Sequence, residues 1–329
     1  MDQSFDVVTI GHAIVDVLAP SDNEFPEAHG MEKGTMTLVD AEEAEAIYRD
    51  LGPALESSGG SAANTAAGIA ALGGRVAFMG KVRDDALGEV FTHDIRAAGV
   101  EFAAEPATTG PGTGRCLVMV SPDAQRTMAT YLGAGANLYP DDIDHNQLIN
   151  AKIVYVEGYM CGIRETEWTV SKAAAAAHLQ EGRFAISLSD PYWVDLNAAA
   201  FGALLDHVDI LFANEAEATG MTGQDLDGAI KELAHRCDLV AITRGPLGSI
   251  VINEGRFIEV PAYPVDTVVD TTGAGDMYAA GFLYGLTRDL EPEACAHLGG
   301  LVAAEIVSHL GARPQASLSK LAAEAGLLS

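Results

Sequence analysis

A glycine-rich turn near the end of the chain holds an acidic residue where an anion would bind. The sequence DTTGAGD at residues 270–276 follows an extended, β-branched segment and precedes an apolar helical pattern that continues to Leu286. The first N–H groups of a helix have no intrahelical partners, and the helix dipole adds partial positive charge there. Gly273 and Gly275 have no side chains to keep an anion away from this backbone. We therefore expect Gly273, Ala274 and Gly275 to form an anion-binding turn that contains Asp276.

Two roles fit Asp276 on this local pattern. In the first, the carboxylate stays ionised beside the helix dipole, orients a hydroxyl group and accepts its proton late, while the backbone amides take up charge on a transferring phosphoryl group. In the second, Asp276 only caps the helix, because Asp is a favoured capping residue. The local pattern alone favours neither role.

Two separated motifs make the chain similar to a known family. The sequence DTTGAGD resembles the C-terminal signature of the ribokinase-like, or phosphofructokinase B, sugar and nucleoside kinases. A second sequence, GGSAAN at residues 59–64, resembles the other signature of that family and lies at the expected distance upstream. The resemblance covers nearly the whole chain and implies a phosphotransferase that uses ATP and an alcohol acceptor.

The resemblance also implies which residues hold the acceptor. Asp16 follows the first predicted strand, and an acceptor-only carboxylate suits the binding of two vicinal hydroxyls. Gly59, Gly60 and Asn64 are assigned to the sugar hydroxyls. Asn64 supports this role, because it is a polar residue in an otherwise apolar helical turn and a buried amide needs partners. The alternatives are an ordinary loop acid at residue 16 and close helix–sheet packing at the glycines.

A third group of residues is assigned to ATP and Mg²⁺. Asn214 and Glu217 form the NxxE motif of the family at a predicted helix start, where both side chains can face one site. Mg²⁺ needs few protein ligands besides water and phosphates. The alternative is that these acids merely favour the helix N-terminus. Thr243, Gly245 and Gly248 resemble the ATP loop of the family, and because the chain has no Walker sequence the phosphate site must be the turn at 273–276.

Two further features concern a cation and the acceptor base. In many relatives a loop corresponding to residues 308–313, together with Asp270 and Thr272, binds a monovalent cation such as K⁺, so Thr272 is placed with the cofactor site. Residues 113–116 and 131–138 are similar to the adenosine kinases in particular. Tyr159 and Tyr192 follow predicted strands and resemble the aromatic residues that enclose the purine there, although aromatics at strand ends are often simple core caps.

The elements that position these residues alternate between strand and helix after Pro140. Such alternation indicates a doubly wound α/β fold, with a mostly parallel sheet and helices on both faces. Ligands then bind at the carboxyl ends of the strands. We assign residues 1–16, 40–107 and 137–329 to this large domain. Residues 17–39 and 108–136 are expected to form a small β-sheet lid over the acceptor.

Composition excludes several other classes of protein. The 329-residue chain has a net charge of −28, which argues against nucleic acid because that partner needs a basic face. Apolar runs are short, and the first residues lead directly into a strand, so we expect no membrane segment, no signal peptide and a cytoplasmic location. The four cysteines are far apart and show no zinc spacing, which predicts free thiols.

The sequence thus predicts a kinase with Mg²⁺ and ATP that phosphorylates a primary hydroxyl, in first place the 5′-hydroxyl of adenosine or a related nucleoside. The alternative is a free sugar such as ribose, fructose or a keto-deoxy sugar. Tyr159 and Tyr192 distinguish the two, since only a nucleoside needs apolar surfaces around a base. A non-catalytic nucleotide sensor would be expected to have lost Asp276 or Glu217, and both are present. Monomer and homodimer both remain open.

Overall fold

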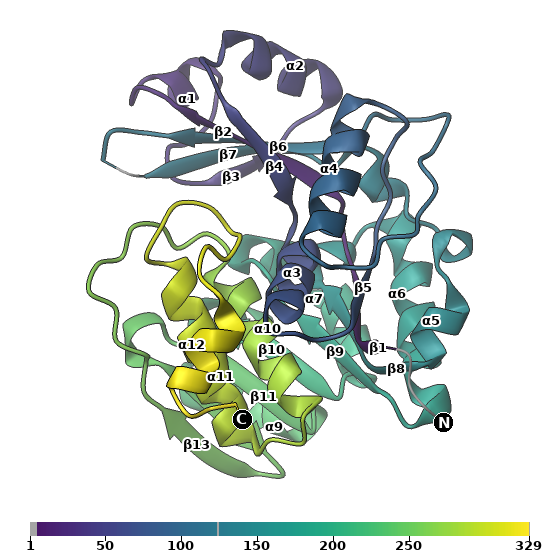
Figure 1. Cartoon of the computed structure of the whole chain (residues 1–329), viewed down its shortest axis with the longest axis vertical. Helices are drawn as coiled ribbons and strands as arrows, with labels where there is room; N and C mark the ends of the chain where they lie inside the picture. The colour runs from purple at the N-terminus through teal and green to yellow at the C-terminus, as the bar shows by residue number, and fades with distance from the viewer. Residues whose placement is uncertain (1–4, 124, 329) are drawn as a thin grey trace.

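The computed structural model describes residues 5–123 and 125–328, and its larger part is built on an eight-stranded sheet (Figure 1). The strand order is β13-β12-β11-β10-β9-β8-β1-β5, in which β12 is antiparallel to both of its neighbours, β11 and β13, and every other neighbouring pair is parallel. The strands are β1 (Phe5–Ile10), β5 (Val76–Met79), β8 (Ala151–Glu157), β9 (Arg183–Ser187), β10 (Ile210–Asn214), β11 (Leu239–Thr243), β12 (Ser249–Asn253) and β13 (Arg256–Val260). The chain leaves β1 toward β5 on one side and later fills the other side from β8, so the strand order reverses at β1 and β8. Ligands of open α/β sheets bind at such a reversal.

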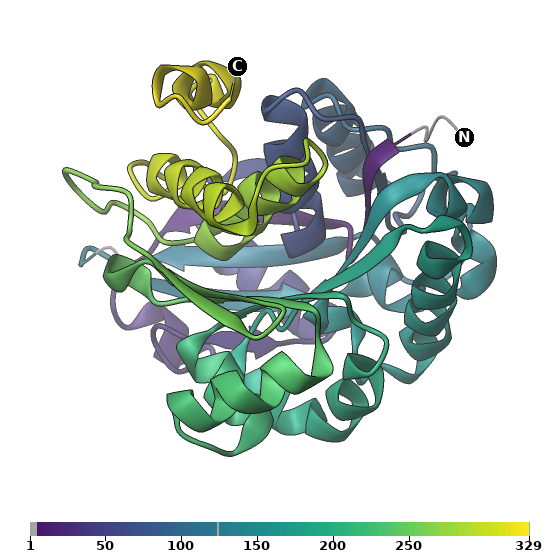
Figure 2. The same cartoon turned by 90° about the horizontal axis from the view of Figure 1, so that it is seen from below.

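Helices cover both faces of this sheet, as Figure 2 shows. Successive strand residues point to opposite faces, so that Tyr155 packs into one core and Val154 and Val156 into the other. Both faces are therefore apolar, as expected for a parallel sheet between helices. One layer contains α3 (Ser61–Ala71), α10 (Ala274–Leu286), α11 (Pro292–Ile306) and α12 (Leu318–Glu324), and the other contains α5 (His145–Ile149), α6 (Arg164–Ala177), α7 (Pro191–Leu205), α8 (Glu215–Thr222) and α9 (Leu226–Arg236). The predicted fold class is confirmed.

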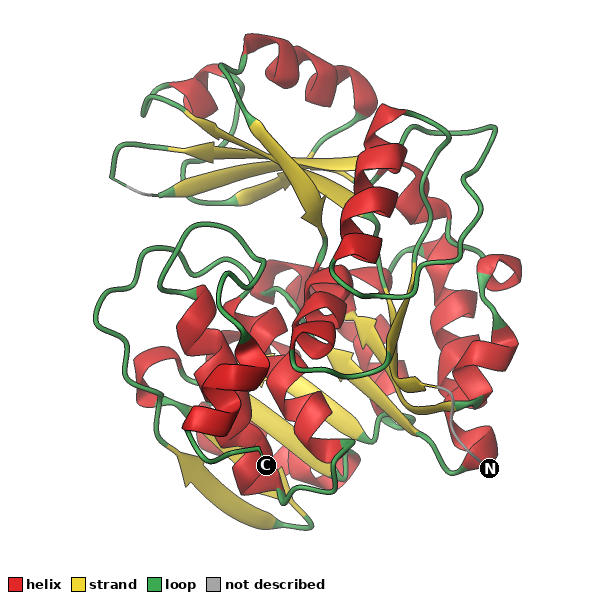
Figure 3. Cartoon of the chain, in the orientation of Figure 1, coloured by secondary structure: helices red, strands yellow, loops and turns green. Residues whose placement is uncertain are grey.

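A second sheet forms the lid above the large sheet (Figure 3). Its strand order is β3-β7-β6-β2-β4, with β2 (Ile14–Pro20), β3 (Met36–Leu38), β4 (Leu55–Gly59), β6 (Gly114–Val120) and β7 (Arg126–Tyr131). Helices α1 (Phe25–Ala28) and α2 (Ala41–Asp50) cover its outer side, and α4 (Ala86–Ala97) contacts the edge strand β4. In the part of the chain that the structure describes, no helix is both long and apolar enough to cross a membrane.

The lid begins earlier and extends further than the expected boundaries. Residues 40–59 were assigned to the large domain, but β4 pairs with β2, placing Ser57 opposite Asp16. Asp16, which was also assigned to the large domain, is part of the lid strand β2. The reason is backbone pairing, since the buried N–H and C=O groups of β2 need hydrogen-bond partners that β4 and β6 provide.

Helix α10 carries the glycine-rich turn into the centre of the molecule. Gly273 is its N-cap, with a left-handed φ of 76°, and Met277 to Gly285 are all buried. Large side chains such as Phe282 and Leu283 each contribute roughly 1.5–3 kcal/mol by leaving water. A methyl group at Gly281 would lie 2.8 Å from the Gly299 Cα of α11, so the two helices cross closely. This packing fixes the first turn of α10, where Asp276 lies.

Candidate active site

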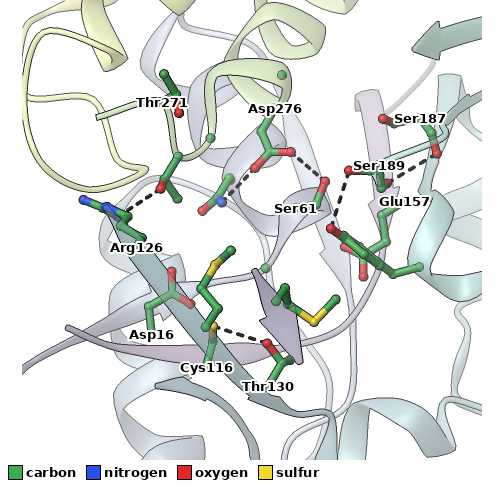
Figure 4. Close-up of a pocket in the computed structure, with 18 of the residues that line it drawn as sticks. Asp16, Ser61, Cys116, Arg126, Thr130, Glu157, Ser187, Ser189, Thr271 and Asp276 are labelled. Carbon is green, nitrogen blue, oxygen red and sulfur yellow. Dashed lines mark hydrogen bonds between the residues drawn. The ribbon is translucent and has the colours of Figure 1, made fainter. Parts of the chain in front are cut away.

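A cavity of about 710 Å³ lies between the lid sheet and the carboxyl ends of the large sheet. Figure 4 shows Asp276 reaching it from α10 and Asp16 from the lid strands on the opposite side. Of the predicted site residues, the cavity is lined by Asp16, Gly60, Asn64, Tyr159, Asn214, Glu217, Thr243, Thr272, Gly273, Gly275 and Asp276. Residues far apart in sequence are therefore brought to one site at the strand-order reversal.

Asp276 does not cap its own helix. Its Oδ1 accepts a hydrogen bond from Ser61 Oγ at 2.6 Å, and its Oδ2 accepts one from Asn64 Nδ2 at 2.9 Å. Burial raises the pKa of Asp276 to about 6, although these two hydrogen bonds oppose the rise. A pKa in this range suits a group that accepts a proton near neutral pH. The side chain is thus held by α3 and remains in contact with the cavity, which favours the first of its two roles.

The glycine-rich turn at the start of α10 has the properties of an anion cradle. A methyl group added to Gly275 would have no atom within 4 Å apart from its chain neighbours and its own helix backbone, so this backbone faces open space. Gly273 needs its positive φ, and a side chain there would come within 2.8 Å of the Ala312 Cβ. Gly273 and Gly275 line the cavity, whereas the Ala274 side chain is not among the lining groups.

The two glycines before α3 leave room for Asp16 of the lid and for the backbone of His12. A methyl group at Gly59 would lie 2.3 Å from Asp16 Oδ2, so Gly59 is required by the position of that carboxylate. Gly60 has a φ of 94°, and its added methyl would lie 2.4 Å from the His12 carbonyl oxygen. Burial raises the pKa of Asp16 to about 6, Arg313 opposes the rise and Asp276 adds to it. The structure therefore places two partly buried carboxylates at one cavity.

Asn64 has unused hydrogen-bonding capacity. Its amide donates to Asp276, while its Oδ1 is buried without a partner among the described residues. A buried acceptor left unpaired costs about 1–3 kcal/mol. Asn64 lines the cavity, and its role toward the hydroxyl groups of an acceptor stays a prediction.

Arg126 was not identified from the sequence. It begins β7 of the lid and donates from Nη1 to Thr272 Oγ1 at 2.9 Å, while its Nη2 forms an ion pair with Asp270. The Asp270 carboxylate also accepts from the Thr272 and Gly311 backbone N–H groups at 3.0 and 2.9 Å. A guanidinium thus lies where the sequence predicted a monovalent cation. These residues do not fit K⁺ in this arrangement, because Asp270 already has a positive partner and two N–H donors.

Glu157 and His12 were also missed, and together they form the floor of the cavity. Glu157, at the end of β8, accepts from the His12 backbone N–H at 2.9 Å and the Ala62 N–H at 2.8 Å. Its Oε1 lies 2.7 Å from His12 Nδ1. A carboxylate that accepts two backbone bonds favours the tautomer with the proton on Nδ1. Nε2 is then buried and has no hydrogen-bond partner in residues 5–123 and 125–328. The sequence signal was an acidic residue ending an apolar strand.

Asn214 and Glu217 cap α8 and contact the cavity at the same time. Asn214 Oδ1 accepts from the Glu217 N–H at 2.8 Å, and Glu217 accepts from the Asn214 backbone N–H at 2.9 Å and from its Nδ2 at 2.7 Å. These bonds form the helix cap that was the alternative to a metal role for Asn214 and Glu217. Burial raises the pKa of Glu217 to about 7, the Asn214 N–H opposes this, and Asp190 and Asp276 add to it. A bound Mg²⁺ would offset the negative charge that Glu217 carries when it is ionised. In the described part of the chain, no group of three or more His, Cys, Asp or Glu side chains forms a metal cage.

The predicted ATP loop is only partly at the cavity. Thr243 lines it, but Gly245 and Gly248 do not. Gly248 has a φ of 90°, and an added methyl would lie 2.0 Å from the Val260 carbonyl oxygen, so the turn between β11 and β12 explains this glycine. A nucleotide role of Gly245 and Gly248 stays a prediction.

One of the two predicted stacking tyrosines points away from the cavity. Tyr159 lines it, whereas the Tyr192 side chain is 69% exposed. Asp190 caps α7 through the Trp193 N–H, and this turn directs Trp193 inward and Tyr192 outward. The apolar surface comes instead from the lid sheet, through Ile14, Met36, Leu38, Cys116, Val118, Met128 and Leu132.

The fold and this cavity define a class of enzymes that bind a small hydroxyl compound between a lid and an α/β sheet. Comparison with known proteins supports this assignment to a class of enzymes. The model of the pfkB family carbohydrate kinases matches residues 4–318. An adenosine kinase structure from Sinorhizobium meliloti is 44% identical with a TM-score of 0.93, covering 98% of this chain and 99% of that one. A probable sugar kinase structure from Rhizobium etli CFN 42 is 41% identical with a TM-score of 0.95, covering 99% and 100%. Adenosine kinase from Saccharomyces cerevisiae is 27% identical over 93% of this chain and 95% of its own length.

The chain therefore belongs to the pfkB family of carbohydrate kinases. It is a sugar or nucleoside kinase, a phosphotransferase that acts on an alcohol group. The recognition of the family from its two signatures is confirmed.

Proposed function

We propose that the protein transfers the γ-phosphoryl group of ATP to the 5′-hydroxyl of adenosine or a related nucleoside. The observation that carries this proposal is the apolar lid wall, which includes Val118 and Met128 and faces the cavity that contains Asp16 and Asp276. A nucleoside has a flat apolar base on one side and a polyhydroxyl ring on the other. The cavity has the same division, whereas a free sugar would leave the apolar wall without a partner.

In this mechanism the acceptor is held from its sugar side. Asp16 accepts hydrogen bonds from the two ribose hydroxyls, and the unpaired Asn64 Oδ1 accepts another. Asp276, fixed by Ser61 and Asn64, faces the primary hydroxyl and receives its proton as phosphoryl transfer proceeds. The backbone N–H groups from Gly273 to Asp276 stabilise the charge that develops on the transferring group.

At the ATP end, Asn214 and Glu217 are proposed to hold Mg²⁺, and Thr243, Gly245, Gly248 and Thr272 the nucleotide. Mg²⁺, when bound, offsets the negative charge of the phosphates. Lid closure is proposed to exclude water from ATP before the reaction. The Arg126–Asp270 ion pair supports closure, because it connects the lid directly to the start of α10.

The second candidate is the same reaction on a free sugar. Asp16 and Asn64 suit any vicinal diol, and a 41% identical relative is named as a probable sugar kinase. The proposal is tested by coupled ADP release with adenosine, inosine, guanosine, ribose and fructose as acceptors. We expect kcat/KM to be highest for adenosine. A higher value for ribose or fructose would replace the nucleoside proposal. If wild type releases no more ADP than a boiled control with any of these acceptors, the nucleoside proposal is wrong.

A further inference from the structure

Arg313 connects three segments at the point where the lid joins the large domain. It lies in the loop between α11 and α12, and its Nη1 donates to the Ala63 carbonyl oxygen at 2.7 Å. Its Nη2 donates to Ser58 Oγ at 3.0 Å. Ser58 belongs to lid strand β4 and Ala63 to helix α3. The Arg313 side chain therefore bonds to one residue before and one residue after the Gly59–Gly60 connection. Neither signature motif of the family contains this arginine.

The Arg313 guanidinium is also close to the carboxylates of the acceptor site. Its partner Ala63 precedes Asn64, which donates to Asp276, and its partner Ser58 precedes Gly59, where an added methyl would lie 2.3 Å from Asp16 Oδ2. Asp16, Asp276 and Asp94 are its charged neighbours, and none of them forms an ion pair with it within 4 Å in the described part of the chain. Burial lowers the pKa of Arg313 to about 10, and it stays charged at neutral pH. Its charge therefore acts on Asp16 and Asp276 through space, in a site where water screens little.

We propose that Arg313 is a positioning residue of the acceptor site, whose two hydrogen bonds hold the lid connection while its charge offsets Asp16 and Asp276. This inference rests on the proposed function and deepens it. Other charged or titratable groups also act on Asp16 and Asp276. The Arg313 variants must therefore leave all of these groups unchanged. The groups are Arg126 and Cys116 beside Asp16, and Glu157, Glu217, Tyr155 and Tyr159 beside Asp276.

The first experiment measures kcat against pH for wild type, Arg313→Gln and Arg313→Lys. Without the positive charge, the acidic limb of the profile moves to higher pH. If the pKa of Asp276 rises from about 6 to about 7, the ionised fraction falls about fivefold at pH 6 and only about 1.1-fold at pH 8. Arg313→Lys keeps the charge and loses the planar pair of donors, so we expect a wild-type acidic limb with a raised KM for the acceptor.

Arg236→Gln is the matched control, because Arg236 also donates to a backbone carbonyl and to a nearby side chain but lies away from the cavity. Its acidic limb should match wild type. If Arg313→Gln lowers kcat by the same factor at pH 6 and pH 8, or if Arg313→Lys shifts the limb as far as Arg313→Gln does, the electrostatic role is wrong.

A second readout needs no catalysis and separates this inference from the proposed function. Because the folded pKa values of Asp16 and Asp276 are raised, their stabilising contribution is present at low pH and is lost as pH rises through about 6. Removing the Arg313 charge increases that loss. We expect the Tm difference between wild type and Arg313→Gln to be larger at pH 8 than at pH 4.5, and the difference for Arg236→Gln to be constant. A pH-independent difference for Arg313→Gln would overturn the inference even if the enzyme phosphorylates nucleosides, and a pH-dependent one would support it even if no acceptor is found.

Discussion

The two sheets of the molecule differ in how many of their faces are covered by helices. The large sheet is covered by helices on both sides, and its two cores are continuous. The lid sheet is covered on one side only, where Val15, Val17 and Leu117 pack inward. Its other side, with Ile14, Val118 and Met128, faces the cavity. The lid therefore presents apolar surface that no other element of the described chain covers completely.

This difference separates the chemistry from the selection of the acceptor. Asp276 and the α10 turn belong to the rigidly packed large domain, where positions are fixed by a close helix crossing. The lid contributes shape and apolar area, together with Asp16 and Arg126. If the comparison is correct, changes in the large domain should lower turnover for every acceptor, and changes in the lid wall should discriminate among acceptors.

The largest expected effect is that of Asp276→Asn. The variant keeps the shape of the side chain but cannot accept the proton, so kcat should fall by about 10²–10⁴ while acceptor binding is largely retained. Turnover with several acceptors and calorimetric binding of adenosine measure the two quantities. Turnover equal to wild type would remove Asp276 from the mechanism. It would also contradict the assignment of the chemistry to the large domain and of acceptor selection to the lid.

Gly275→Ala should have the next largest effect. The added methyl has no atom within 4 Å apart from its chain neighbours and its own helix backbone, so folding is expected to be unaffected, but the methyl projects into the anion cradle. Loss of a transition-state donor contact typically costs about 10²–10³ in kcat. Gly52→Ala is the control, since Gly52 also has open space around an added methyl but lies outside the cavity. Equal kinetics for both variants would argue against phosphate binding at the turn.

Val118→Thr tests the lid wall. The change introduces a hydroxyl into the apolar face with little change of volume, and we expect kcat/KM for adenosine to fall roughly tenfold. Activity on ribose, if measurable, should not change. Val120→Thr on the same strand is the control, because Val120 packs on the same apolar cluster but does not line the cavity. An equal fall in kcat/KM for adenosine and ribose would mean that the lid wall does not bind the base of the nucleoside.

The smallest effect concerns pH and Mg²⁺. With the pKa of Glu217 raised to about 7, its carboxylate is mostly protonated at pH 6.5 and mostly ionised at pH 8. The apparent affinity for Mg²⁺ should therefore increase about fourfold over this range, in proportion to the ionised fraction. Activity titrated with Mg²⁺ at each pH measures this. In Glu217→Gln the dependence should disappear, and its persistence would assign the effect to another group.

Local sequence pattern was sufficient for the elements with strong periodicity and for the glycine-rich turns. The helix start at Gly273 and the alternation of strands and helices after Pro140 are both present in the structure. Each depends on residues close in sequence, whose spacing and backbone preferences are set locally. The cysteines, predicted to be free thiols, are buried and unpaired.

Contacts between distant segments could not be read in this way. The orientation of Tyr192 depends on how α7 is capped and rotated, which its type and position do not reveal. The pairing of β4 with β2 brings residues 55–59 into the lid, and no local pattern specifies that partner. Gly248 resembles a nucleotide-binding glycine, and the sequence does not show that its backbone also passes close to Val260, a contact that requires glycine whatever its role toward ATP.

By itself, the sequence determined which family the chain belongs to and where a helix would present an anion cradle with a carboxylate, because backbone preferences and motif spacing are local properties. Tertiary structure alone decided what surrounds that carboxylate. Arg126, Glu157 and Arg313 come from a lid hairpin, a central strand and a C-terminal loop. Their charges act together only because folding removes water and brings the first two to the cavity and Arg313 to the lid connection at Ser58 and Ala63.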